Sequence, residues 1–210
     1  PLYNERSGEK YFDFQKLIPM PAELEVEDGS RTEQRIIYFL TERCTIPVRD
    51  LDQRKSDLVR KLVSNDFAKM DWPEEVFNRT LNWMSGATDE ERDNAYEGGR
   101  QYISNYETHG FTTWYGWCRH NWGTKWNACE TQIIDSDTIV FDTAWSNPGP
   151  IIRKLGELYP DRRVEHWWAD EDVGYNTGHR VVENGVEQVE CYDGGLEGDK
   201  LYEKCWCLVD

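Results

Sequence analysis

The sequence lacks any long apolar run. The longest uninterrupted stretch covers residues 36–40, whereas a membrane-spanning helix needs about 20 consecutive apolar residues. Residues 1–10 are polar and charged, with no basic start before an apolar segment, so we expect no signal peptide. Together these absences predict a chain that acts in the cytoplasm and has no membrane partner.

Basic residues are scarce. The chain holds 24 Lys and Arg against 40 Asp and Glu, a formal net charge of −16. Because contacts from Lys and Arg to phosphates supply most non-specific affinity for nucleic acid, this balance argues against a duplex nucleic-acid partner. The deficit is deepest over residues 165–210, with 3 basic and 12 acidic residues. Solubility, repulsion of nucleic acid and attraction of a basic partner all fit such a charge.

Cysteine pairs with the spacing of a metal or redox motif are also missing. None of the six cysteines forms a C-x-x-C pair, and the close pair Cys205 and Cys207 has no second pair with which to hold zinc. A disulfide scaffold is usually shorter and richer in cysteine. We therefore expect free thiols in a reducing compartment.

The short motifs of catalytic sites are absent as well. The chain contains no G-x-S-x-G nucleophile elbow, no H-E-x-x-H metal pair and no Walker phosphate loop. Cys118 and His120 would point apart on a helix, and the pairs Gly98–Gly99 and Gly194–Gly195 are interpreted as turns. We expect no catalytic residue, metal or cofactor. This expectation disfavours an enzyme, although the sequence leaves catalysis an open question.

Aromatic residues and periodic apolar residues are plentiful. Ten Trp, 11 Tyr and 7 Phe make the chain too aromatic for a disordered protein. Apolar spacing of three and four predicts helices over 51–70, from Pro73 to Gly86 and from Thr88 to Tyr106, the last opened by a capping box. Residues 22–35 are polar and predict a loop. Residues 1–110 are thus expected to form a mainly helical region.

The period changes in the second half. Alternation predicts strands over 137–145 and 163–169, with a helix between them that Pro160 ends. Asn184–Gly185 between two β-type runs predicts a hairpin with a type I′ turn, and residues 196–204 and 205–209 predict a helix and a closing strand. This order is a ferredoxin-like βαββαβ arrangement with one extra hairpin strand. The expected fold class is α+β, a helical region packed on a ferredoxin-like domain over residues 111–210.

Residues 114–127 form the densest aromatic segment. One interpretation is a core hinge where a helix docks on the sheet, with Lys125 over an indole as a cation–π pair. The other is an aromatic pocket that stacks a base, a sugar or a partner side chain, with Asn and Lys fixing its orientation. The candidate binding residues are Trp114, Trp117, Asn121, Trp122, Lys125, Trp126 and Asn127, joined by Trp145, Trp167 and Trp168.

An acidic segment follows the Trp167–Trp168 pair. Asp170, Asp172 and Asn176 resemble part of a calcium loop, but Gly174 occupies the position of the third ligand. Two other interpretations stay open. The acids can end a strand by accepting backbone amides or pairing with arginine, or Asp170, Glu171 and Asp172 can contact a partner.

Four strings of the chain resemble a known family. They are NWGTKWNA (121–128), FDTAWSNP (141–148), WWADEDVGYNTG (167–178) and FDFQKLIPMP (12–21). They resemble the YubB family of phage- and plasmid-borne proteins, which has a C-terminal ferredoxin-like domain. The resemblance covers mainly residues 110–210, and it implies that fold and a mobile-element setting in a bacterial host. It implies neither a reaction nor an iron–sulfur cluster.

Two functional hypotheses follow. The first is an accessory protein without enzymatic activity that binds a host bacterial protein; in one version its carboxylates stand where the phosphates of a nucleic acid would lie. The alternative is a nucleotide or single-stranded nucleic-acid binding module with a Trp-rich pocket. Indoles buried beneath the sheet would remove that pocket, whereas indoles around an open surface near residues 170–172 would support it. The oligomeric state is left open.

Overall fold

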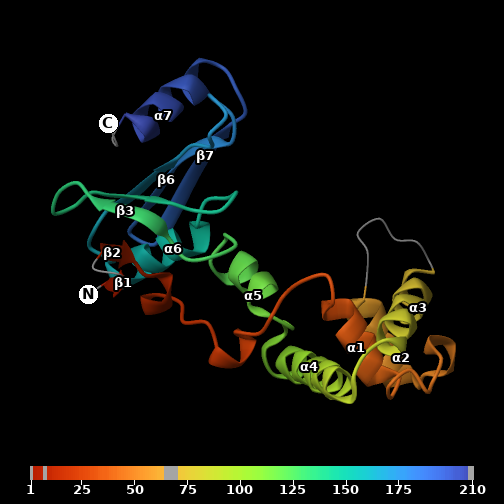
Figure 1. Cartoon of the computed structure of the whole chain (residues 1–210). Coiled ribbons are helices and arrows are strands. Elements are labelled where there is room, and N and C mark those ends of the chain that lie inside the picture. The colour runs from red at the N-terminus through yellow and green to blue at the C-terminus, as the bar shows by residue number, and fades with distance from the viewer. Residues whose placement is uncertain (1, 7–8, 64–70, 208–210) are drawn as a thin grey trace. The chain divides into compact units, whose positions relative to one another are not determined.

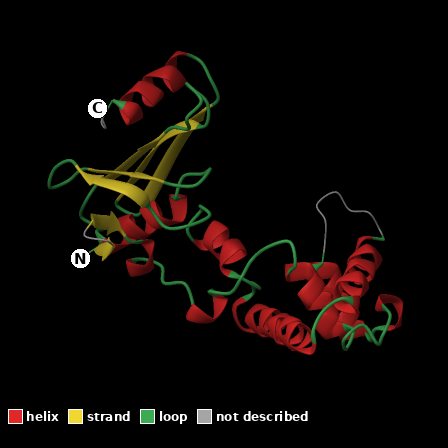
Figure 2. Ribbon diagram, viewed as in Figure 1, coloured by secondary structure: helices red, strands yellow, loops and turns green. Residues whose placement is uncertain are grey.

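The chain packs into two compact units (Figures 1 and 2). The computed structural model describes residues 2–6, 9–63 and 71–207. The helical unit is Pro21–Trp114, and the C-terminal unit combines Pro1–Met20 with Tyr115–Asp210. Residues 1–20 therefore pack with the second half of the chain, whereas the sequence analysis assigned them to the first region.

The helical unit is built from α1 (Thr32–Leu40), α2 (Gln53–Leu62), α3 (Trp72–Ser85) and α4 (Asp89–His109), with short 3₁₀ turns at Ala22–Leu24 and Val48–Asp50. The predicted apolar spacing is confirmed, because these helices bury one shared core. Its buried members are Ile36, Ile37, Leu40, Val59, Val63, Val76, Phe77, Tyr102 and Ile103. The helix predicted over 51–70 ends at Leu62, and residues 64–70 lie outside the described part.

Three local predictions in this unit can be compared with the structure. The capping box is confirmed: Thr88 accepts from the Glu91 N–H, and the Glu91 side chain accepts from the Thr88 N–H. The loop predicted over 22–35 is wrong at its end, since α1 begins at Thr32 to bury the apolar residues that follow. The turn predicted at Gly98–Gly99 is wrong too, because both residues lie inside α4.

The C-terminal unit combines strands and helices. The strands are β1 (Tyr3–Arg6), β2 (Glu9–Phe12), β3 (Cys129–Ile133), β4 (Ile139–Asp142), β5 (Val164–Trp168), β6 (Thr177–Glu183) and β7 (Val186–Tyr192). They form antiparallel β1-β2 and β3-β4 pairs and an antiparallel sheet in the order β5-β6-β7. The helices are the 3₁₀ turn Phe14–Lys16, α5 (Trp114–Asn121), α6 (Gly149–Leu158) and α7 (Leu196–Trp206). The expected α+β class is confirmed.

Two predictions near the C-terminus can be compared with the structure, the hairpin turn and the closing strand. Asn184 and Gly185 have φ of 52° and 75°, as the predicted type I′ turn requires. The closing strand predicted over 205–209 is wrong, because α7 runs on to Trp206, whose ring lies one turn after that of Tyr202 with centroids 5.8 Å apart. Residues 208–210 of that prediction lie outside the described residues.

Candidate functional site

Half of the aromatic segment lies in the core. Trp117 and Trp122 are buried, with ring centroids 5.6 Å apart at 85°. Trp122 also packs edge-on against Phe14, and its Nε1 donates to the Ile18 carbonyl at 2.8 Å. A buried indole has no ring face open to a ligand, and the N–H of Trp122 is already satisfied. The core interpretation describes these two tryptophans, and Trp114, the first residue of α5, is half-buried.

Both asparagines of the segment are engaged within the fold. Asn127 Oδ1 accepts from the Phe14 N–H at 2.8 Å, and its Nδ2 donates to Asp13 Oδ1 at 2.7 Å. Asn121 Nδ2 donates to the Trp117 carbonyl at 3.0 Å. Asn127 thus fastens the FDFQ string to the C-terminal unit, which gives a packing reason for its presence.

The other half of the segment forms an exposed aromatic surface. Lys125 Nζ lies 4.6 Å from the ring centroid of Trp126, 4.6 Å from that of Trp145 and 5.9 Å from that of Tyr115. Trp145 is 72% exposed and Trp126 is 45% exposed. We call these four residues the Lys125 patch. The predicted cation–π pair is confirmed, and it involves more than one indole.

Two loops hold the patch together. Thr124 Oγ1 donates to the Ala144 carbonyl at 3.0 Å, and Ser146 Oγ donates to the Gly123 carbonyl at 2.7 Å. Gly123 has a φ of 82°, and a Cβ there would lie 2.7 Å from Pro150 Cδ, so glycine is needed for this close approach. The loop after α5 and the loop after β4 are thereby fixed against each other.

Trp145 leaves the strand in a conformation that bulky residues rarely adopt. The sequence predicted a strand over 137–145, but β4 ends at Asp142 and Trp145 has a φ of 63°. A left-handed non-glycine residue costs on the order of 1–3 kcal/mol and persists only where its surroundings hold it. The two loop hydrogen bonds flank this residue and hold its indole beside Lys125 and in solvent.

The patch lies in a part of the chain without acidic residues. No Asp or Glu occurs over residues 108–129 or 143–156, which carry the patch, whereas Arg119, Lys125, Arg153 and Lys154 do. The Arg119 guanidinium lies 5.5 Å from the Tyr115 ring centroid. Tyr115 was not among the predicted site residues, although its spacing of four from Arg119 on a helix was a usable signal.

Trp167 and Trp168 make packing contacts on the sheet. Trp168 stacks on His166 with centroids 5.0 Å apart, and a Cβ at Gly178 would overlap its ring. Trp167 stacks on His179 at 5.2 Å, and Lys204 Nζ lies 3.4 Å from its ring centroid. Trp167 and His179 are a cross-strand pair, which stabilises a sheet, and His166 and Trp168 are neighbours on the same face of β5. These contacts do not require a ligand.

The acidic segment directly follows β5, and Asp170 accepts hydrogen bonds there, as in the interpretation of these acids as a strand end. Asp170 Oδ2 accepts from Asn176 Nδ2 at 2.9 Å, and its Oδ1 accepts from the Glu171 N–H at 2.7 Å. The Asn176 hydrogen bond is the main cause that lowers the pKa of Asp170. Glu171 and Asp172 are exposed. Within the described ranges, no group of three or more His, Cys, Asp or Glu is arranged to hold a metal ion.

Cys118 is a core residue of α5. Its Sγ lies 3.7 Å from Met20 Sδ, and burial raises the pKa of the thiol to about 12. The thiol therefore stays protonated at neutral pH and supplies no thiolate nucleophile.

Burial of His166 predicts a loss of stability in acid. Desolvation, followed by the charge of Arg180, lowers the pKa of His166 to about 3 from an ordinary value of 6.5. The unfolded state therefore takes up a proton below pH 6.5 while the folded state does not, and stability falls as the pH drops from 6.5 toward 3. Between pH 6.5 and 4.5 this costs about 2 to 3 kcal/mol.

Urea unfolding at several pH values measures this loss. The variant His166→Gln removes the titration, so the difference in unfolding free energy between wild type and variant should shrink as the pH falls. A His166→Gln profile parallel to that of the wild type would contradict the assignment.

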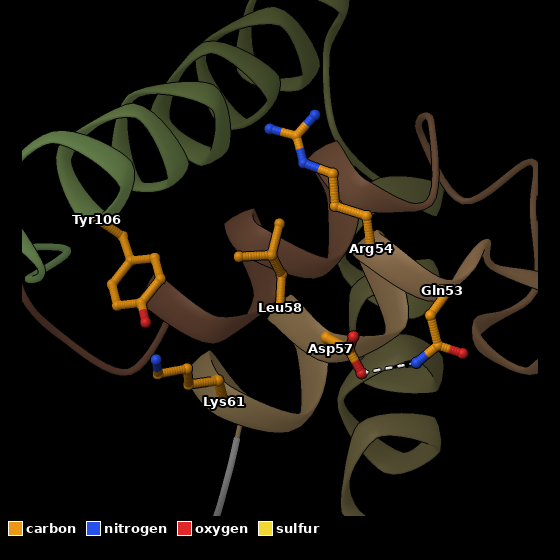
Figure 3. Close-up of a pocket in the computed structure, with 6 residues that line it drawn as sticks. All are labelled: Gln53, Arg54, Asp57, Leu58, Lys61 and Tyr106. Carbon is orange, nitrogen blue, oxygen red and sulfur yellow. Dashed lines mark hydrogen bonds between the residues drawn. The ribbon is translucent and has the colours of Figure 1, made fainter.

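A second surface feature is a groove of about 560 Å³ in the helical unit (Figure 3). It is lined by Gln53, Arg54, Asp57, Leu58, Lys61 and Tyr106. Its polar groups are already engaged: Gln53 donates to Asp57 at 2.8 Å, Lys61 lies over Tyr106, and Arg54 pairs with Glu107. Such pairs are typical of a solvated helix surface, so the groove takes no part in the candidate site.

The comparison with protein families identifies the domain. Residues 121–203 match the family model described as the ferredoxin-like domain in Api92-like protein. This match bears out the expected ferredoxin-like domain, while the narrower resemblance to the YubB family remains a proposal. Neither the comparison with curated proteins nor that with solved structures yields a match. In the described residues, every helix is too short or too polar to cross a bilayer.

Proposed function

We propose that the C-terminal unit binds a nucleotide or a short single-stranded nucleic acid at the Lys125 patch. The observation that carries this proposal is the pair of exposed indoles, Trp126 and Trp145, on a surface whose nearest charge is the Lys125 ammonium. Stacking of a base on an aromatic side chain contributes about 1–3 kcal/mol. Lys125 is placed to leave its aromatic contacts and meet the adjoining phosphate.

The chemistry of the patch favours unpaired bases over a duplex. Indole faces need free base faces, which a duplex keeps stacked. The net charge of −16 opposes the broad phosphate contacts on which duplex binders rely. The patch offers two cations, Lys125 and Arg119, so the salt dependence of binding should be weak. The slope of log K against log salt concentration should be about −0.7 for each phosphate contacted.

Fluorescence anisotropy with a labelled oligothymidylate of about ten nucleotides tests the proposal at low salt. We expect Trp145→Ala to weaken binding by about 5- to 150-fold, which is the stacking free energy above expressed as an affinity ratio. Lys125→Gln should weaken binding and reduce the salt slope. Thermal stabilisation by mononucleotides is the second arm, and it separates recognition of a single nucleotide from recognition of a strand.

The matched control is Trp206→Ala. Trp206 is 44% exposed, close to the 45% of Trp126, but it lies on α7 and donates to the Asp170 carbonyl at 3.1 Å. It should bind as the wild type does. The proposal fails if wild type binds neither oligonucleotide nor nucleotide at low salt, or if Trp145→Ala and Trp206→Ala bind alike.

As a second candidate we propose the hypothesis that the sequence placed first, a protein that binds a host bacterial protein in the cytoplasm. Its support is an acidic surface on the C-terminal unit, where residues 181–199 contain six acids and no Lys or Arg. The nucleic-acid mimic is one version of it, in which these carboxylates take the place of phosphates. The YubB-type mobile-element setting belongs to this proposal too.

A further inference from the structure

Strand β7 is one of the two edge strands of the three-stranded sheet. The sheet order is β5-β6-β7, and among the strands that the structure describes none pairs with the outer edge of β7 (Figure 1). Residues 186–191 are all exposed, including Val186 at 59% and Val189 at 45%. An edge strand with free N–H and C=O groups is a template for pairing with another chain.

The register shows which backbone groups are free. Glu183 and Val186 flank the two-residue turn, so they form a hydrogen-bonded pair, and bonded and non-bonded pairs alternate from there. The non-bonded positions of β7 are Glu187, Val189 and Cys191. Their N–H and C=O groups therefore point to the outer edge, where they offer a regular row of donors and acceptors.

Several of the usual protections of an edge strand are absent from β7. Natural edges are blocked by proline, lysine, bulges or short length, whereas β7 pairs with β6 over seven residues without a register shift and contains neither proline nor lysine. Its charges are negative. Glu187 is compensated by Arg153 and Arg180, at 3.2 and 2.8 Å, while Glu190 accepts a hydrogen bond from Tyr192 and has no cation among its described contacts.

We propose that β7 receives an extended, basic segment of another protein as an added strand. Main-chain hydrogen bonds to the outer edge would supply affinity, and the acids of residues 181–199 would select a segment with Lys or Arg at alternate positions. A second copy of this chain is disfavoured as the occupant, because two β7 strands would place two negatively charged segments side by side, each with Glu187 and Glu190 and without Lys or Arg. This surface is separate from the Lys125 patch and does not depend on nucleotide binding.

Anisotropy with a labelled ten-residue peptide that alternates Lys and Val tests this proposal on the full chain. We expect the peptide to bind, a peptide alternating Glu and Val not to bind, and a Lys–Val peptide N-methylated at every residue to bind at least about tenfold more weakly, because neither of its edges can then donate to β7. The variant Val189→Pro removes an outward N–H and spares the β6–β7 ladder. It should weaken peptide binding to a similar extent, whereas Val189→Thr should keep it.

Several results would overturn this proposal. Equal binding of the parent and N-methylated peptides would show attraction by charge alone, and a wild-type dimer that Val189→Pro abolishes would assign the edge to a second copy. If Val189→Pro fails to fold, the N-methylated peptide still decides. Oligonucleotide binding should persist in Val189→Pro, so the failure of this proposal is distinguishable from that of the Lys125 patch.

Discussion

Replacing Gly99 by alanine is expected to lower the free energy of unfolding of the helical unit by about 3 kcal/mol. Gly99 lies in the middle of α4, where α1 approaches closely. An added Cβ would overlap the Arg35 carbonyl oxygen of α1 and lie 2.7 Å from Phe39 Cβ. Backbone atoms cannot move aside as a side-chain end can, so the two helices must separate and their shared core must loosen.

Gly98→Ala is the matched control one residue away. A Cβ at Gly98 would meet only the flexible side chain of Arg35, with Cδ at 3.2 Å. Because alanine favours a helix over glycine by up to about 1 kcal/mol, this variant should be neutral or more stable. Urea unfolding followed by circular dichroism measures both. Equal destabilisation by the two substitutions would contradict the close approach of α1 and α4 at Gly99.

Asn127→Ala is expected to cost the C-terminal unit about 3 kcal/mol. The substitution removes hydrogen bonds to the Phe14 N–H and the Asp13 carboxylate, and Asp13 and Phe14 are both buried. Leaving a buried polar group without its partner costs about 1–3 kcal/mol, and more where the group is charged. Packing of residues 12–18 against Trp122 depends on the same anchor.

Thermal unfolding followed by tryptophan fluorescence measures this loss. Asn121→Ala is the control, because half-buried Asn121 donates one hydrogen bond, to the Trp117 carbonyl four residues earlier, and its removal should cost no more than about 1 kcal/mol. If both variants unfold at the same temperature as the wild type, Asn127 is not an anchor, and its interpretation as a ligand contact regains support.

The elements that were correctly predicted depend on short-range chemistry. The capping box of Thr88 and Glu91 and the turn at Asn184–Gly185 are set by residues at most three positions apart. The failures have distant causes. Gly98–Gly99 suggested a turn because the approach of α1, more than sixty residues earlier, was not visible. Where a strand was predicted from residue 205, helix α7 continues to Trp206, which contacts Tyr202 one turn earlier.

The candidate site shows the same division. The sequence identified the aromatic segment and the cation–π pair of Lys125, but it could not separate buried from exposed indoles. Trp122 is buried because Phe14 and Ile18 cover it, more than a hundred residues away in the chain. Trp145 is exposed because two loop hydrogen bonds turn it out of its strand.

By itself, then, the amino-acid order determined the acidic charge, the absence of known catalytic motifs, most helices and the hairpin, since these depend on composition or on neighbours within a few residues. Only the tertiary structure decided which indoles are exposed, which asparagine anchors the chain and which strand edge is open. Burial and backbone pairing are properties of contacts between distant segments, and each of those contacts requires a partner that local sequence does not specify.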